Sequence, residues 1–122
     1  MSTLGAFTLA VLMTASGIAH FALPAYFRTL VPAWLPAPGA LVVATGLANI
    51  VAGTLLLAPG SRPAGGWLAT ALIATYLTSH VNALHQAHPS QLRFLDRPTG
   101  VAARLLVNIA YLAWAVLVAQ HG

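Results

Sequence analysis

The sequence predicts an all-α, polytopic membrane protein: one domain of four transmembrane helices in an up-down-up-down bundle, with a short amphipathic segment between the first two helices. Of its 122 residues, 59% are hydrophobic and 5% are charged, whereas an average soluble domain has roughly a quarter charged residues. Apolar runs of about 20 residues, the length that crosses a ~30 Å hydrocarbon layer as a helix, recur along the chain. These runs are residues 4–23, 39–58, 64–84 and 101–119.

Prolines and glycines mark where these runs end. Residues 58–63, APGSRP, predict a tight turn between the second and third runs. Pro89 follows the third run and Pro98 opens the fourth, as expected where helices end and begin. No Arg or Lys precedes the first apolar run, unlike a secretory signal, so we expect this run to be a membrane span rather than a cleaved leader.

The first connection, residues 24–38, combines helical periodicity with helix-breaking prolines. Its large apolar residues recur at helical spacing: Tyr26, Phe27, Leu30, Val31 and Trp34. Prolines at 32, 36 and 38 prevent a long helix. We interpret the segment as a short amphipathic helix at the membrane interface, with Tyr26 and Trp34 in the aromatic belt. A lid or re-entrant piece over a pocket is the alternative.

The arginines predict the orientation in the membrane. Arg28, Arg93 and Arg97 lie in the first and third connections, Arg104 lies just inside the fourth run, and the second connection holds only Arg62. Because basic residues gather on the cytoplasmic side, we expect connections one and three in the cytoplasm and both chain ends outside. Arginine without lysine, in a chain rich in Ala and Gly, is typical of a GC-rich bacterial genome, so the expected location is the inner cell membrane.

Strongly polar side chains interrupt the apolar runs, and each is costly in hydrocarbon unless something satisfies it. The six that we consider ligand-binding candidates are His20, Asn49, Asn82, His85, Arg104 and Asn108. In an antiparallel bundle, the ends of the first and third runs share one side with the start of the fourth. Five of the six should therefore converge near connections one and three, with Asn49 nearer the middle as the floor of a pocket.

Helical phase assigns faces to these residues at about 100° per residue. In the third run a polar stripe surrounds Asn82 and comprises Thr75, Thr78, Ser79, His85 and Gln86, while Tyr76 and His80 fall on the other side. The second run has a face of small residues suited to close helix packing: Thr45, Gly46, Asn49, Ala52 and Gly53. The first run groups Met13, Ser16, Gly17 and His20, and the fourth groups Arg104, Asn108 and Tyr111. We therefore expect the Asn82 stripe to face the bundle and His80 not to belong to it.

Several kinds of chemistry find no support in the composition. The chain has no cysteine and one acidic residue, Asp96, so it offers no thiolate metal site, nucleophilic triad or carboxylate relay within a span. His85 and His88 could share a face with His20 or His80, but without nearby thiols or carboxylates we expect no metal site and no haem. Five arginines are too few to argue for nucleic acid.

A purely structural role also fits the polar residues. Asn and Thr in membrane helices often serve only as bonds between helices. Arg104 could extend to a lipid phosphate. It could also bind Asp96 or an anionic ligand, since the first turn of a helix disfavours a cation without a local acceptor.

The chain resembles the DoxX-like family of small four-helix membrane proteins (DoxX, DoxD and MauE-like). The matching stretches are GIAHF at 17–21, LVPAWLPAP at 30–38, GLANIVAGTLLL at 46–57, the region of Asn82, and residues 104–108. That family often has Glu at the position of Asn49, Pro-Ala-Asn at 80–82, and Gln at the position of Asn108. The resemblance therefore implies a pocket that keeps its hydrogen-bonding capacity but lacks the carboxylate for acid–base work.

Family members include thiosulfate:quinone oxidoreductase subunits, accessory proteins of redox complexes and receptor-assembly chaperones. Our leading hypothesis is a membrane subunit, without catalytic activity of its own, that binds a quinone or lipid headgroup. His20, Asn82 and Asn108 would bond its oxygens, and Arg104 would supply positive charge. The alternatives are a structural or assembly partner without a ligand, and a subunit of a membrane redox enzyme. Expected partners are membrane lipids, other membrane or redox proteins, or further copies of the chain.

Overall fold

The computed structural model describes residues 3–90 and 94–121 and is all-α within them, as predicted. The α-helices are α1 (Thr3–Ala22), α2 (Pro24–Leu30), α3 (Pro38–Leu56), α4 (Arg62–Gln86) and α5 (Pro98–His121), and a 3-10 turn, η1, spans Phe94–Asp96. The four long helices cover the four predicted apolar runs. Arg93, one of the residues used to predict orientation, lies outside the described residues.

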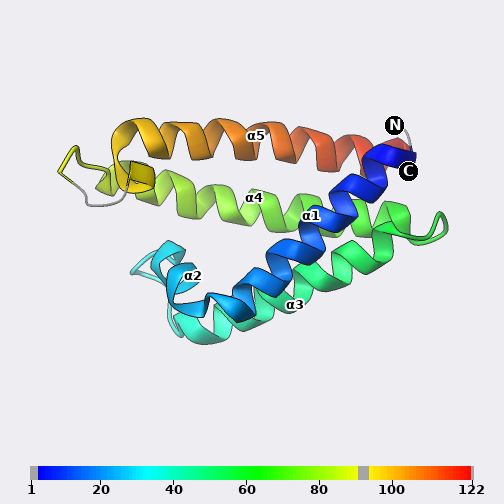
Figure 1. The fold of residues 1–122 in the computed structure, drawn as a ribbon, viewed down its shortest axis with the longest axis horizontal. Helices are drawn as coiled ribbons and strands as arrows, with labels where there is room; N and C mark the ends of the chain where they lie inside the picture. Colours follow the sequence, from blue (N-terminus) through cyan, green and yellow to red (C-terminus); the bar gives the residue numbers. More distant parts are fainter. Residues whose placement is uncertain (1–2, 91–93, 122) are drawn as a thin grey trace.

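The long helices form two pairs (Figure 1). α1 packs along α3, α4 packs along α5, and the pairs are joined where α3 meets α4. The start of α1 and the end of α5 lie together at one end of the molecule, where the pairs converge. Toward the other end the pairs separate, and α2 lies in the space between them. An up-and-down path with both ends on one side agrees with the predicted topology.

Three helices in the described part of the chain are long and apolar enough to cross a membrane, namely α1, α3 and α5. They indicate a multi-pass membrane protein. The fourth long helix, α4, has 25 residues but carries Thr, Ser, His and Asn side chains over its second half. By composition alone α4 does not qualify as a membrane span. Three of the four predicted spans are therefore supported.

The outward surfaces of these helices are apolar. On α5, Leu106 and Val107 are 69% and 66% exposed, and Ile109 is exposed beside them. Water would disfavour such a continuous apolar surface, whereas lipid tails accommodate it. The exposed leucines and valines therefore agree with the membrane assignment.

Small residues let α1 approach α3 closely. The predicted small-residue face of α3 is buried, including Gly46, Asn49, Ala52 and Gly53. A Cβ atom on Gly17 of α1 would lie 2.7 Å from the backbone oxygen of Gly46, closer than real Cβ contacts permit. This crossing point fixes the end of α1, and with it the position of His20 one turn further along.

The hydrophobic core occupies the end of the molecule near the chain termini. Its largest members are Leu9 and Met13 of α1, Leu56 of α3, Ile73 of α4 and Val118 of α5, all fully buried. Because these side chains come from the first two-thirds of α1 and the matching parts of its neighbours, they leave the opposite end less filled.

The segment between α1 and α3 forms the predicted short helix, α2, followed by a turn-rich stretch. Pro24 begins α2, where its missing N–H costs nothing, and Pro38 begins α3. Ala37, between the turn and α3, has φ 50° and ψ 59°. This left-handed conformation is energetically unfavourable for residues other than glycine. This connection closes one side of the space between the helix pairs.

Candidate functional site

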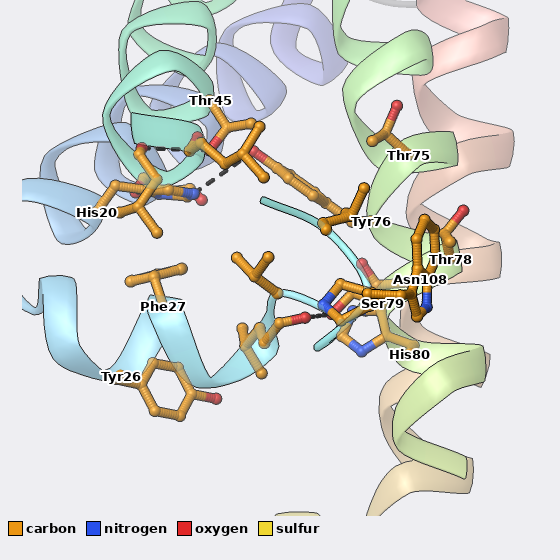
Figure 2. Close-up of a pocket in the computed structure, with 18 residues that line it drawn as sticks. His20, Tyr26, Phe27, Thr45, Thr75, Tyr76, Thr78, Ser79, His80 and Asn108 are labelled. Atoms are coloured by element: carbon orange, nitrogen blue, oxygen red, sulfur yellow. Dashed lines mark hydrogen bonds between the residues drawn. The ribbon is translucent and has the colours of Figure 1, made fainter. Parts of the chain in front are cut away.

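A cavity of about 590 Å³ lies between the α1–α3 and α4–α5 pairs. Its apolar and aromatic wall comes mainly from α2 and the following stretch: Tyr26, Phe27, Leu30, Val31, Trp34 and Leu35. Its polar wall comes from the long helices: His20, Thr45, Tyr76, Ser79, His80 and Asn108. Figure 2 shows His20 and Phe27 facing Tyr76, Ser79 and His80 across this space.

His20 is held firmly at the α1 side of the cavity. Its side chain is 4% exposed, and its Nδ1 lies 2.6 Å from the backbone oxygen of Ser16. The imidazole stacks on the Phe27 ring, with 3.9 Å between ring centroids. Its Nε2 lies 3.5 Å from the hydroxyl oxygen of Tyr76, so the far side of the imidazole faces α4.

Asn49 supports this arrangement from behind. It is fully buried, and its Nδ2 donates to the Thr45 backbone oxygen at 2.8 Å and to the Tyr76 hydroxyl oxygen at 2.5 Å. Asn49 is therefore near mid-span, as the sequence indicated, but it does not line the cavity itself. It positions Tyr76, which does.

Arg104 is surrounded by acceptors from its own end of the molecule. Its Nη1 donates to the Leu95 backbone oxygen at 2.9 Å and forms an ion pair with Asp96 Oδ1 at 3.3 Å. Its Nε donates to His80 Nδ1 at 3.3 Å, and Nη2 lies at the same distance from that atom. Of the acceptors considered from the sequence, the structure pairs Arg104 with Asp96, and the guanidinium is only 10% exposed.

The expectation that His80 lies away from the inward-facing polar residues was wrong. His80 lines the cavity and accepts from Arg104, and Tyr76, also assigned to the other side, lines the cavity as well. The physical reason is that α4 packs against α3 on one side and α5 on the other, so it buries more than one face. The i, i+4 spacing of Tyr76 and His80 was the signal that could have found them.

A second cavity of about 160 Å³ lies on the outer side of the first, and most of its lining is polar. It is lined by Thr29, Leu30, Ser79, Asn82, Ala83, Gln86, Asp96 and Arg104. Leu30 and Ser79 line both cavities, and the Ser79 hydroxyl donates to the Leu30 backbone oxygen. This contact ties α2 to α4 at the border between the two spaces.

The six residues predicted to bind a ligand are thus divided. His20 and Asn108 line the larger cavity, and Asn108 also donates to the Arg104 backbone oxygen at 2.7 Å. Asn82 and Arg104 line the smaller cavity. Asn49 lies behind Tyr76. His85 is exposed and lines neither of these two cavities. Within residues 3–90 and 94–121, no group of three His, Cys, Asp or Glu residues is placed to hold a metal ion.

Residues 9–119 match the family described as "Domain of unknown function (DUF8561)", and the chain belongs to that family. No curated protein and no solved structure matches the chain.

Proposed function

We propose that this DUF8561 protein spans the inner membrane four times and holds the headgroup of a lipophilic molecule, a quinone or a lipid, in the larger cavity, without catalytic activity of its own. The observation that carries the proposal is the cavity itself. Its volume of about 590 Å³ lies in the range typical of small-molecule sites, and a mostly apolar wall with a few inward polar groups is the usual composition of such sites.

The position of α4 supports a fourth span. At about 1.5 Å per residue, its 25 residues are about 38 Å long, and after Arg62 at its start it has no Asp, Glu, Lys or Arg. It packs against α3 on one side and α5 on the other. Polar residues such as Tyr76, Ser79 and His80 line the cavity rather than the outer surface, so their polarity need not meet lipid.

The predicted orientation would place the cavity on the cytoplasmic side of the membrane. It lies at the end that carries the first connection and η1, near Arg28 and Arg104, the side that the positive-inside rule assigns to the cytoplasm. Trp34 is 66% exposed in the first connection, as a belt aromatic at the membrane interface would be. The resemblance to DoxX-like proteins, some of which work with quinones, agrees with this role.

The charge of the site supports a neutral headgroup. Arg104, the predicted source of positive charge, already forms an ion pair with Asp96 and donates to His80 and Leu95. Little positive charge is left for an anionic ligand. His20, Tyr76 and Asn108 can instead bond neutral oxygens, and Phe27, whose ring stacks on His20, lines the cavity beside them.

Quinone binding to the purified protein tests the proposal. We would titrate protein in phosphatidylcholine nanodiscs with ubiquinone-1, using empty nanodiscs as the blank, and identify co-purified lipid or quinone by native mass spectrometry. Asn108→Leu should weaken binding about tenfold because it removes a polar group from the wall. Gln120→Leu, an exposed amide on the same helix, is the matched control and should bind normally. The absence of saturable binding and of any co-purified lipophile would refute the proposal.

A structural role is the second candidate, and the bonds between helices favour it. Asn49 joins α3 to Tyr76 of α4, and Arg104 joins α5 to His80 of α4. If holding helices together is their whole purpose, Asn49→Leu should lower stability or partner assembly, and wild-type protein should bind no ligand. Tight, saturable quinone binding by the wild-type protein would exclude this reading.

A further inference from the structure

The position of the ring proton on His20 follows from its neighbours. Its Nδ1 lies 2.6 Å from the Ser16 backbone oxygen, and a carbonyl oxygen can only accept, so Nδ1 carries the proton. In a neutral imidazole the other ring nitrogen, Nε2, then carries no proton. Its Nε2 therefore presents a lone pair toward Tyr76.

Tyr76 presents the complementary group. Its hydroxyl oxygen accepts from Asn49 Nδ2, and the hydroxyl also has one proton of its own to donate. The distance from this oxygen to His20 Nε2 is 3.5 Å, longer than the ~2.5–3.0 Å typical of hydrogen bonds from hydroxyl groups. The cavity wall thus holds an acceptor, His20 Nε2, beside a donor, the Tyr76 hydroxyl, and the hydrogen bond between them is long and weak.

His80 has the opposite proton arrangement. Arg104 Nε and Nη2 both lie 3.3 Å from its Nδ1, and a guanidinium has only donors. His80 Nδ1 must therefore accept, which leaves the ring proton on Nε2. Figure 2 shows His20 and His80 on different sides of the cavity, so the first is fixed as an acceptor and the second as a donor.

We propose that the cavity selects a lipophilic molecule with a hydroxyl group on a ring, and that this hydroxyl donates to His20 Nε2 while accepting from the Tyr76 hydroxyl. The inference rests on the proposed function and narrows its ligands to those that carry a ring hydroxyl, such as a quinol rather than the oxidised quinone. A hydroxyl is a small neutral group that both donates and accepts. A carbonyl or ether oxygen accepts from Tyr76 but leaves the buried Nε2 of His20 without a donor, which lowers affinity. The stacked Phe27 ring supplies an aromatic neighbour for the ligand ring.

A pair of probes that differ only in the hydroxyl proton tests this inference. We would measure binding of 4-hexylphenol and its methyl ether, 4-hexylanisole, to the protein in phosphatidylcholine nanodiscs by calorimetry, with empty nanodiscs as the blank. The phenol should bind at least about tenfold more tightly than the ether. Equal affinities would overturn the selection of hydroxyl groups and leave the proposed function standing. If neither probe shows saturable binding, the hydroxyl-bearing ligand is ruled out, and the ubiquinone-1 titration decides the proposed function separately.

Two variants distinguish the acceptor from the donor. His20→Phe keeps an aromatic ring against Phe27 but removes the acceptor, so the phenol should lose its advantage and bind within about threefold of the ether. Tyr76→Phe removes the donor, so both probes should weaken while the preference for the phenol persists. Tyr111→Phe on α5, a tyrosine that does not line the cavity, is the matched control and should leave the ratio unchanged. A folded His20→Phe protein that keeps the tenfold preference, or a Tyr76→Phe protein that loses it, would overturn the assignment.

Discussion

Arg104 of α5 reaches across to α4 and holds His80 by one ring nitrogen, with its Nε and Nη2 both 3.3 Å from His80 Nδ1. The same guanidinium reaches Asp96 and the Leu95 backbone oxygen near η1. The Arg104 guanidinium thus links the start of α5 to His80 of α4 and to η1, which lies in the connection between these two helices. The charge positions His80 in the wall of the larger cavity, whereas Arg104 itself lines the smaller one.

The proton positions on the two cavity histidines can be read directly. With ¹⁵N-labelled histidine, long-range ¹H–¹⁵N correlation spectra should show His20 protonated on Nδ1 and His80 on Nε2, because their partners are a carbonyl and a guanidinium. Loss of the corresponding signals in His20→Phe and His80→Gln variants provides the assignment. The exposed His85 serves as the reference signal. The same proton position on His20 and His80 would contradict the structure.

Removal of the Arg104 guanidinium should destabilise the fold. Arg104→Gln loses the ion pair with Asp96 and the bonds to His80, and we expect the free energy of unfolding to fall by about 1–3 kcal/mol. Thermal unfolding in mild detergent, or unfolding by increasing SDS, measures the change. Arg28→Gln on α2 is the control, because Arg28 is exposed and its loss should have little effect. Equal stabilities for the two variants would argue that the Arg104 contacts contribute nothing.

Close packing of α1 on α3 should make Gly17 intolerant of even a methyl group. In Gly17→Ala the new Cβ would lie 2.7 Å from the Gly46 backbone oxygen, so the helices must separate at a cost of about 1–3 kcal/mol. Gly39→Ala is the matched control, since nothing lies within 4 Å of a Cβ at that position of α3. It should be neutral or slightly stabilising, because alanine favours helix over glycine. Similar unfolding midpoints for both variants would be inconsistent with the described crossing.

The bond from Ser79 to the Leu30 backbone oxygen should restrain α2. In Ser79→Ala we expect amide hydrogens of residues 25–31 to exchange about fivefold faster, the effect of losing roughly 1 kcal/mol of local stability. Hydrogen–deuterium exchange with mass spectrometry measures this directly. Thr78→Val, one residue earlier on α4, removes a hydroxyl without touching this bond and should leave the exchange of α2 unchanged. Unaltered exchange in Ser79→Ala would show that α2 is held by packing alone.

Helix positions were readable from the sequence because they depend on local composition. Runs of apolar residues between prolines gave the four long helices, and the helical spacing of Tyr26, Phe27 and Leu30 gave α2. Small residues around Gly46 correctly indicated the buried face of α3. Each of these features follows from periodicity within one helix.

The partners of the polar residues were not readable, because they depend on how helices pack together. A single polar stripe was assigned to α4 on the assumption that it presents one face to the bundle, whereas it is packed on two sides. Tyr76 therefore turned inward to meet Asn49, and His80 turned inward to meet Arg104. His85, which the stripe included, extends to the outside instead.

The placement of the cavity between helices with apolar outer surfaces has a consequence for how any affinity should be expressed. A lipophilic compound would reach this cavity from the bilayer, where it is dissolved at a concentration far above that in water. The relevant quantity is then its mole fraction in the lipid, and adding empty vesicles would dilute the compound without changing the protein. Occupancy by the proposed ligand would then follow the composition of the membrane and not the amount of compound added to the water.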